Sequence, residues 1–260
     1  MICKNFVLAV MPSELPAALR YPVALAALSY RIVGGRLMRD ASGGTVGPGK
    51  GVIPVVCDAG FDGQPFDLRR FGGDVAAELA AREASGVVAD FARPDSPVLR
   101  DAAGELARVA RRAGVPLYTS PAYAAYAPGA HVLIGSHVSE GSLKAALTDA
   151  CARYGAGQVA LEVIPMRIDC PLPAEDGGAR LTEEELAEKL RQLAPMTFFS
   201  SELCSKYFTY LAPDRRAHFV LYDDASTIRA KLQTARSCGV DTAFLLYAEV
   251  AEMLPELLAE

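Results

Sequence analysis

Short apolar runs alternate with longer amphipathic segments along most of the chain. Runs that are apolar at successive positions are typical of strands buried on both faces of a parallel sheet. Eight runs predict such strands: 5–11, 23–30, 52–57, 86–91, 115–119, 159–166, 218–222 and 242–247. Two shorter runs, 132–134 and 196–199, are spare strand candidates.

The amphipathic segments carry apolar residues three and four positions apart, which predicts helices that cover a sheet. They span 74–83, 97–113, 142–154, 182–193 and 226–238. Thr182 and Glu185 have the spacing of a capping box, and Ser226 can cap the helix that follows it. Glycines 114, 155 and 239 stand where a helix is expected to end.

Eight strands that alternate with helices over 260 residues predict an α/β fold, a single (β/α)8 TIM barrel domain over 1–260. The glycine-rich segment 40–51 is expected to be a surface loop of this domain, and it is a candidate lid. Within it, Gly44 to Lys50 is similar to a phosphate-binding loop. Gly51 stands where that loop needs Ser or Thr, and Pro48 removes a backbone donor, so no nucleotide is expected here.

Composition narrows the possible partners. Hydrophobic residues make up 51% of the chain and charged residues 22%, which suits a protein with a large core. The net charge of -5 argues against nucleic acid as a partner. Because no apolar run is long enough for a signal-peptide core or a membrane helix, we expect a cytoplasmic protein with no membrane partner.

Neither the cysteines nor the histidines suggest a metal or a cofactor. The six cysteines contain no C-x-x-C pair and are interpreted as reduced, mostly buried thiols. The three histidines have no spacing that places two of them on one helix face. No ligand cluster is visible in the sequence, so we expect no metal site.

Polar side chains follow several of the predicted strands. In a (β/α)8 barrel the C-terminal ends of the strands share one face, and the active site is assembled there. The candidate site residues are Asp58, Asp90, Arg93, Tyr123, Arg167, Asp169, Tyr222, Asp223, Asp224, Tyr247 and Glu249.

Each candidate also has a purely structural interpretation. Asp223 or Asp224 can cap a helix, and Asp90 can pair with Arg93. Arg167 and Asp169 can form a salt bridge at the rim, while Glu249 can lie on a solvated helix face. The recurrence of polar residues at one end of successive strands is what favours a functional cleft.

Several of these segments resemble family 18 glycoside hydrolases, the chitinase-like barrels. Residues 85–92, Ser-Gly-Val-Val-Ala-Asp-Phe-Ala, resemble the strand-four signature D-G-x-D-x-D-x-E, and 159–169 is similar to the strand-six pattern M-x-Y-D. The segments 207–210, 218–231 and 239–247 resemble the end of the spore-cortex peptidoglycan N-acetylglucosaminidases of that family. Residues 23–37 also resemble their second strand and loop.

The resemblance implies a catalytic arrangement that this chain lacks in part. In the family, the final glutamate of the strand-four signature protonates the glycosidic oxygen, and the aspartate two residues earlier orients the substrate's acetamide. The resemblance thus implies chemistry that needs no organic cofactor. Here these positions are Ala92 and Asp90. The strand-six aspartate matches Asp169, but Ile168 replaces the tyrosine. The chain has no tryptophan for a sugar subsite, although Tyr247 lies near that place.

Three hypotheses follow from these departures. In the first, which the sequence favours because Ala92 replaces the general acid, the protein has lost the hydrolytic step and binds a carbohydrate or a peptidoglycan-derived glycopeptide at the barrel face. In the second, it is an active glycoside hydrolase with relocated acids, chosen from Asp90, Asp169, Asp223 and Glu249. In both of these hypotheses the residues expected to contact the ligand are Asp58, Arg93, Tyr123, Arg167, Tyr222, Asp224 and Tyr247. In the third, the protein is a structural or interaction barrel without a ligand cleft.

Overall fold

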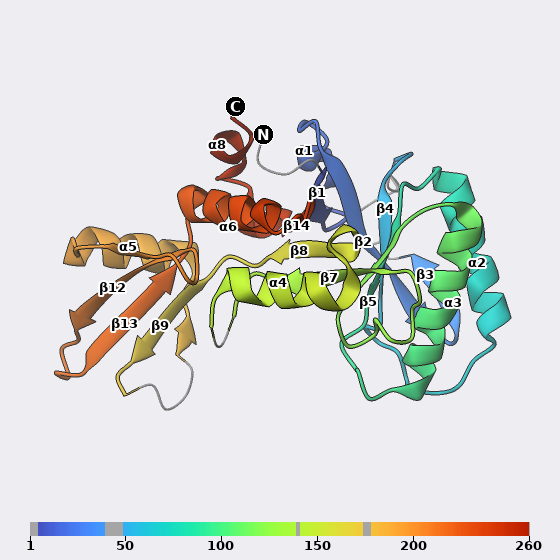
Figure 1. Cartoon of the computed structure of the whole chain (residues 1–260), viewed down its shortest axis with the longest axis horizontal. Coiled ribbons are helices and arrows are strands. Elements are labelled where there is room, and N and C mark those ends of the chain that lie inside the picture. The colour runs from blue at the N-terminus through green and yellow to red at the C-terminus, as the bar shows by residue number, and fades with distance from the viewer. Residues whose placement is uncertain (1–4, 40–48, 139–140, 174–177, 260) are drawn as a thin grey trace.

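The computed structural model describes residues 5–39, 49–138, 141–173 and 178–259, and its centre is a closed parallel barrel (Figure 1). β1 pairs with β14 on one side and with β2 on the other, which closes the ring. The predicted (β/α)8 fold is confirmed. In ring order the strands are β1 (Asn5–Val10), β2 (Ala24–Val33), β4 (Ile53–Cys57), β5 (Val87–Asp90), β6 (Leu117–Thr119), β7 (His131–Gly135), β8 (Val159–Val163) and β14 (Thr242–Leu246). A short strand, β3 (Arg36–Arg39), pairs antiparallel with the end of β2.

Side chains from alternate positions of the strands fill the barrel interior. Because successive residues of a strand point to opposite faces, one residue in two points inward. The inward cluster contains Val7, Ala26, Ile53, Val55, Val88, Tyr118, Ala160 and Phe244. This packed layer closes the lower barrel and forms the floor of its mouth.

Helices cover the outside of the barrel and bury the other half of the strand residues. α2 (Leu68–Arg82) and α3 (Pro97–Ala113) cover one side, and α4 (Leu143–Tyr154) and α6 (Ala225–Ser237) cover another (Figure 1). Short helices complete the cover: α1 (Leu15–Ala18), α7 (Tyr247–Val250) and α8 (Leu254–Leu258), with a 3-10 turn, η1 (Ala156–Gln158). The helix predicted over 97–113 has those bounds in the structure.

An antiparallel sheet is inserted between β8 and β14. Its strand order is β10-β9-β13-β12-β11, and α5 (Glu183–Leu193) packs on one face of it through a small core that includes Leu186, Phe208 and Val220 (Figure 1). Its strands are β9 (Arg167–Pro171), β10 (Ala179–Arg180), β11 (Phe198–Ser200), β12 (Ser205–Leu211) and β13 (Ala217–Tyr222). We call this unit, residues 167–222, the inserted sheet.

The sequence places one strand in the wrong sheet, and a run that it offers only as a spare strand candidate is part of the barrel. Residues 218–222 belong to β13 in the inserted sheet and not to the barrel, whereas the spare run 132–134 lies in β7, the sixth barrel strand. β8 is therefore the seventh strand, so the likeness of 159–169 to a strand-six pattern does not match its place in the ring. An apolar run alone does not distinguish a barrel strand from an antiparallel strand packed on one face.

The sequence offered both Ser226 and the pair Asp223 and Asp224 as candidate caps of α6. Asp224 is the N-cap and forms a capping box with Thr227, so that prediction is confirmed and the prediction for Ser226 is wrong. The capping box of Thr182 and Glu185 is confirmed.

Other sequence-based expectations can also be compared with the structure. Of the described cysteines, Cys204 is buried and the other four are only partly buried. The prediction that the cysteine side chains are mostly buried is therefore wrong. Most of the proposed lid, 40–51, lies outside the described residues, as does Cys3. None of the described helices is long and apolar enough to cross a membrane.

Candidate functional site

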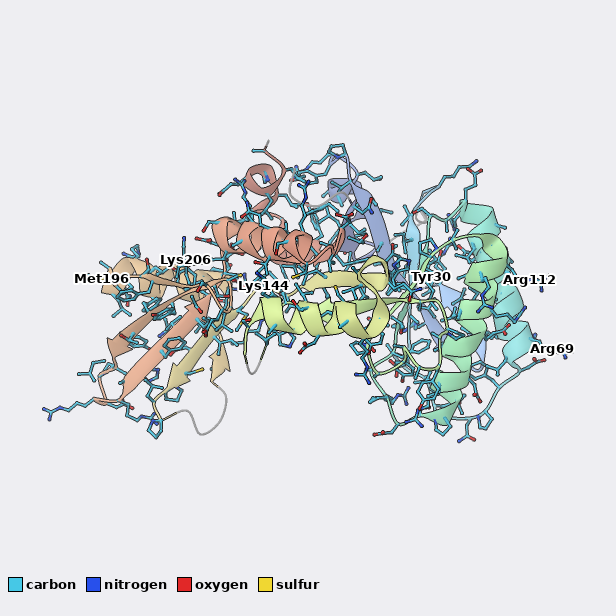
Figure 2. All side chains as sticks on the ribbon, viewed as in Figure 1. Tyr30, Arg69, Arg112, Lys144, Met196 and Lys206 are labelled. Carbon is cyan, nitrogen blue, oxygen red and sulfur yellow. The ribbon has the colours of Figure 1, made fainter. Side chains whose placement is uncertain are left out.

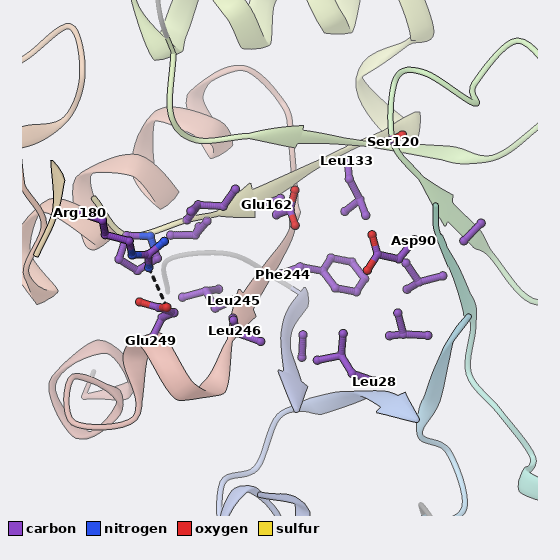
Figure 3. A pocket seen from close by; sticks show the side chains of 17 residues that line it. Leu28, Asp90, Ser120, Leu133, Glu162, Arg180, Phe244, Leu245, Leu246 and Glu249 are labelled. Atoms are coloured by element: carbon purple, nitrogen blue, oxygen red, sulfur yellow. Dashed lines mark hydrogen bonds and ion pairs between the residues drawn. The ribbon is translucent and has the colours of Figure 1, made fainter. Parts of the chain in front are cut away.

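A cavity of about 350 Å³ opens at the C-terminal ends of the barrel strands. Its walls are mostly apolar and include Leu28, Leu133, Phe244 and Leu246, and Figure 3 shows these side chains around the space. The carboxylates among its lining residues are Asp90, Glu162 and Glu249. The cavity has the position expected of a TIM-barrel active site.

Asp90 enters the cavity from β5, the fourth strand of the barrel. Val88 points into the barrel interior, so Asp90, two residues later, points the same way and lies one layer higher. The surrounding cavity walls limit the hydration of the carboxyl group and so raise the pKa of Asp90, and the charge of Asp58 raises it further. Asp90 remains accessible to solvent through the cavity mouth.

Glu162 enters the same cavity from β8, the seventh strand. Ala160 points into the interior, and Glu162 lies one layer above it (Figure 3). Burial raises the pKa of Glu162, and the charge of Asp90 adds to this effect. Because β6 and β7 separate β5 from β8 in the ring, the two carboxylates approach the mouth from separate sides.

Neither carboxylate has a cation beside it among the described residues. Within the part of the chain that the structure describes, the side chains of Asp90 and Glu162 form no ion pair and no hydrogen bond. Two such groups in a largely apolar space hold protons more tightly than isolated carboxyl groups do. The pair can therefore hold a proton and transfer it to a ligand.

Glu249 lies at the rim and is neutralised by two arginines. Its Oε2 accepts a hydrogen bond from Arg167 Nη2 at 2.5 Å, and its Oε1 accepts one from Arg180 Nη2 at 2.7 Å. Both arginines belong to the inserted sheet, whereas Glu249 follows β14. This ion-pair network joins the inserted sheet to the edge of the mouth.

Asp58, Arg93 and Tyr123 are joined by hydrogen bonds that hold the segment after β5 beside the mouth, and they do not line the cavity. Asp58 is buried, and it accepts hydrogen bonds from the Ala92 N–H at 3.0 Å and from Arg93 Nε at 2.9 Å. Tyr123 is fully buried and donates its hydroxyl proton to the Arg93 carbonyl. Ala92 is thereby held by its backbone just beyond the end of β5. Asp90 is not paired with Arg93, whose partner is Asp58.

Three of the remaining candidates hold the inserted sheet together. Asp169 accepts hydrogen bonds from Tyr210 at 2.7 Å, and its carboxylate lies 2.7 Å from His218 Nδ1 and 3.0 Å from Lys189 Nζ. Burial alone would raise the pKa of Asp169, but these partners outweigh it, and the net pKa is lowered. Tyr222 belongs to the core of the inserted sheet. Arg167 pairs with Glu249 and not with Asp169.

Asp223, Asp224 and Tyr247 also lie away from the cavity. Asp223 is buried, and it binds the fully buried Lys231 together with Ser205, Thr227 and the Met166 N–H. Asp224 caps α6 and pairs with Lys206, while Tyr247 packs in the helical layer near Tyr21. Of the residues singled out from the sequence, the structure brings only Asp90 and Glu249 to the cavity.

The sequence contained a usable signal for Glu162, which strand-end reasoning missed. The candidate residues were polar side chains that follow an apolar run, whereas Glu162 lies inside the run 159–166. A charged residue in a strand that is otherwise buried on both faces marks a position that faces a cavity. Alternation places Ala160 and Glu162 on the same face, as it does Val88 and Asp90.

No cluster of three His, Cys, Asp or Glu side chains suited to a metal ion occurs among the described residues.

Comparisons with known proteins rest on the fold. No protein-family model matches the chain, and a search of curated proteins also finds no match. The spore cortex-lytic enzyme SleL of Bacillus cereus superposes with a TM-score of 0.68 at 16% identity, covering 98% of this chain and 74% of that one. A chitinase of Chromobacterium violaceum superposes with a TM-score of 0.67 at 16% identity, covering 96% and 99% of the two chains.

A family 18 chitinase of Cycas revoluta, solved as a mutant in complex with (GlcNAc)4, gives a TM-score of 0.62 at 12% identity, with coverage of 97% and 98%. These likenesses extend over almost the whole chain, including the inserted sheet. The protein has the barrel fold of the chitinases and of the SleL spore cortex-lytic enzymes.

Proposed function

We propose that the protein is a glycoside hydrolase of the chitinase-like kind in which Asp90 and Glu162 carry the acid chemistry. The observation that carries this proposal is the pair itself: two carboxylates without cations, both with raised pKa, in one cavity at the barrel mouth. Of the alternatives left open by the sequence, relocated acids fit this arrangement best, with Glu162 in place of the candidates suggested there.

Each carboxyl group has a part in this mechanism. Glycoside hydrolysis needs one acid that protonates the leaving oxygen while the substrate's acetamide oxygen attacks the anomeric carbon, and one carboxylate that stabilises the positive charge which develops. A water molecule then attacks the anomeric carbon, gives its proton back to the first carboxylate and releases the sugar. Glu162, whose pKa is raised by burial and by Asp90, is the proton donor. Asp90 has the position of the family's orienting aspartate, and it stabilises the charge that forms at the anomeric carbon or the acetamide.

The proposed substrate is a short glycan that contains N-acetylglucosamine. The structural neighbours support this choice, since the Cycas revoluta chitinase was solved with (GlcNAc)4. A cavity of about 350 Å³ accommodates one or two sugar rings, with Phe244 and the surrounding aliphatic side chains against their apolar faces.

A second candidate is glycan binding without hydrolysis. Ala92 favours it, because alanine stands where the family has its general acid and cannot donate a proton. In that case Asp90 and Glu162 hold sugar hydroxyl groups by hydrogen bonds, and no bond is broken.

The first prediction separates the two candidates. We expect the native protein to cleave chitotetraose, and we expect Glu162→Gln and Asp90→Asn each to lower kcat by about 10² to 10⁴, because each removes a group that acts in the transition state. Product formation is measured by chromatography, and binding is measured by titration calorimetry. Glu252→Gln removes an exposed carboxylate outside the cavity and is the matched control.

The outcomes of this experiment are distinct. Binding of chitotetraose without cleavage, weakened in both variants, replaces the hydrolase with the binding protein. Cleavage that persists unchanged in both variants removes the acid pair from the mechanism. If the native protein neither binds nor cleaves the glycan, both candidates fail.

A further inference from the structure

A groove runs between α2 and α3, the two helices that cover one outer side of the barrel. It has a volume of about 500 Å³, and its floor consists of small side chains, Gly72, Gly73, Ala76, Ala80 and Ala113, together with Val109. The two helices are in close contact near Gly72, where an added Cβ would lie 1.8 Å from Glu105 Oε1. We call this surface the arginine groove, because Arg69, Arg108 and Arg112 line it.

The arginine groove carries positive charge that the described residues do not neutralise. Arg108 is paired with Glu105, at 2.7 Å between Nε and Oε2. The side chains of Arg69 and Arg112 are exposed, and they form no ion pair or hydrogen bond with any residue that the structure describes (Figure 2). A protein with a net charge of -5 thus presents a local cationic surface. Guanidinium groups suit carboxylates, which they bind through two parallel hydrogen bonds.

The complementary surface lies on α5. Its first turn holds three glutamates, Glu183, Glu184 and Glu185. Glu185 is bound to the Thr182 N–H in the capping box, whereas the exposed carboxylates of Glu183 and Glu184 have no partner among the described residues. A second hollow, of about 440 Å³, adjoins this turn and is lined by Leu181, Glu184, Glu185, Glu188 and Lys189.

The two surfaces lie at opposite ends of the molecule. Figure 1 places α5 at one end of the longest axis and the pair α2 and α3 at the other. One molecule therefore cannot bring its own α5 to its own arginine groove. A second copy can do so, because its α5 projects from its own end.

We propose that the acidic first turn of α5 of one molecule docks into the arginine groove of a second copy. The small side chains of the floor let a helix approach closely, and Glu183 and Glu184 meet Arg69 and Arg112. The contact joins different surfaces of the two copies, so it builds head-to-tail chains and not a closed symmetric dimer. A contact of one helix turn buries little area, so the association is weak and sensitive to salt.

Sedimentation velocity of the purified protein tests this contact. At low ionic strength we expect the average mass to rise with protein concentration, and at high ionic strength to fall back to that of one chain. Arg69→Glu with Arg112→Glu, or Glu183→Lys with Glu184→Lys, should raise the apparent dissociation constant by at least about tenfold. Equal mixtures of these two double variants should associate again, since each reversed surface then meets its complement.

Two controls make the result specific. Lys144→Glu changes the net charge as Arg112→Glu does but lies on α4, outside both surfaces, and it should leave the association intact. Circular dichroism melting curves show whether each variant is folded. A constant mass of one chain at all concentrations in low salt overturns the proposal, as does association that persists in the arginine double variant or fails to return in the mixture.

Discussion

Asp90 and Glu162 differ from the other acidic groups discussed above in what surrounds them. Asp58, Asp169, Asp223, Asp224 and Glu249 each have a cation in contact, and most of them join two parts of the fold. Asp90 and Glu162 face the cavity instead, and both have a raised pKa. Paired charges stabilise a structure, whereas charges held apart from cations in an apolar cavity destabilise it, and such groups are common at functional sites.

The raised pKa values predict how stability changes with pH. A carboxyl group whose pKa is higher in the folded state binds more protons there, so its contribution to stability is lost as the pH rises through that pKa. The double variant Asp90→Asn with Glu162→Gln has no carboxyl group at either position, so it does not lose this stability as the pH rises. We expect the melting temperature of the double variant to exceed that of the native protein by a margin that grows from about pH 4 to pH 8. A margin that is constant with pH, measured by scanning fluorimetry, contradicts the assignment.

Removing a charge from the buried pair Asp223 and Lys231 is expected to destabilise the protein, whereas removing the charges of Asp90 and Glu162 is expected to stabilise it. Both side chains are fully buried, and Asp223 also accepts hydrogen bonds from Ser205 at 2.8 Å and Thr227 at 2.9 Å. Lys231→Met leaves the carboxylate without its cation, and we expect a loss of about 3–5 kcal/mol in the free energy of unfolding. Urea titration measures it. Combining Lys231→Met with Asp223→Asn should restore part of the loss, and a double variant as unstable as the single one would count against the ion pair.

At the scale of elements, the positions of most helices and strands were predictable, whereas the sheet to which a strand belongs was not. The helix over 97–113 was placed correctly because Pro97 and Gly114 mark its two ends and its apolar residues recur with helical spacing. The strand over 218–222 was assigned to the wrong sheet, since a run of five residues carries no information on its partners. An apolar run also does not show which of its residues face the barrel interior. Asp90 could be predicted because it stands at a strand end, whereas Glu162 could be predicted only once the inward face of its strand was known.

The capping box of α5 gives a prediction for a single element. The Glu185 N–H donates to Thr182 Oγ1 at 3.1 Å, and the Thr182 N–H donates to Glu185 Oε2 at 2.8 Å. Thr182→Ala removes the side-chain acceptor, and we expect a loss of about 1 kcal/mol in the free energy of unfolding. Thr182→Ser keeps the hydroxyl group and should retain most of the stability in the same urea titration. Equal losses in the two variants would show that the cap does not stabilise α5.

At the scale of the whole molecule, we propose that the barrel and the inserted sheet form one domain of 260 residues. Asp223 supports this, because it follows β13 and binds Lys231 of α6 and the Met166 N–H before β9. Glu249, which follows β14, binds Arg167 and Arg180 of the inserted sheet. These buried and partly buried contacts connect the inserted sheet and its flanking residues to the barrel.

One cooperative unit predicts one unfolding transition. In pulsed hydrogen exchange across a urea series, we expect peptides from 198–222 and peptides from 87–119 to become labelled at the same urea concentration. Loss of the inserted sheet at a lower concentration, with the barrel still protected, would divide the chain into two domains. A protein of this size can populate intermediates, so the labelling is compared peptide by peptide.

Closure of the barrel between β1 and β14 sets an order for events during synthesis. β1 pairs with β2 as soon as both have left the ribosome, but its other edge stays without a partner until residues 242–246 emerge. At about 5–20 residues per second, translation of the intervening 24–246 keeps this edge open for ten seconds or more. An open apolar strand edge is a site for pairing with other chains. The growing chain therefore carries an open apolar edge until β14 emerges, and a chaperone that shields β1 over that interval should raise the yield of folded protein.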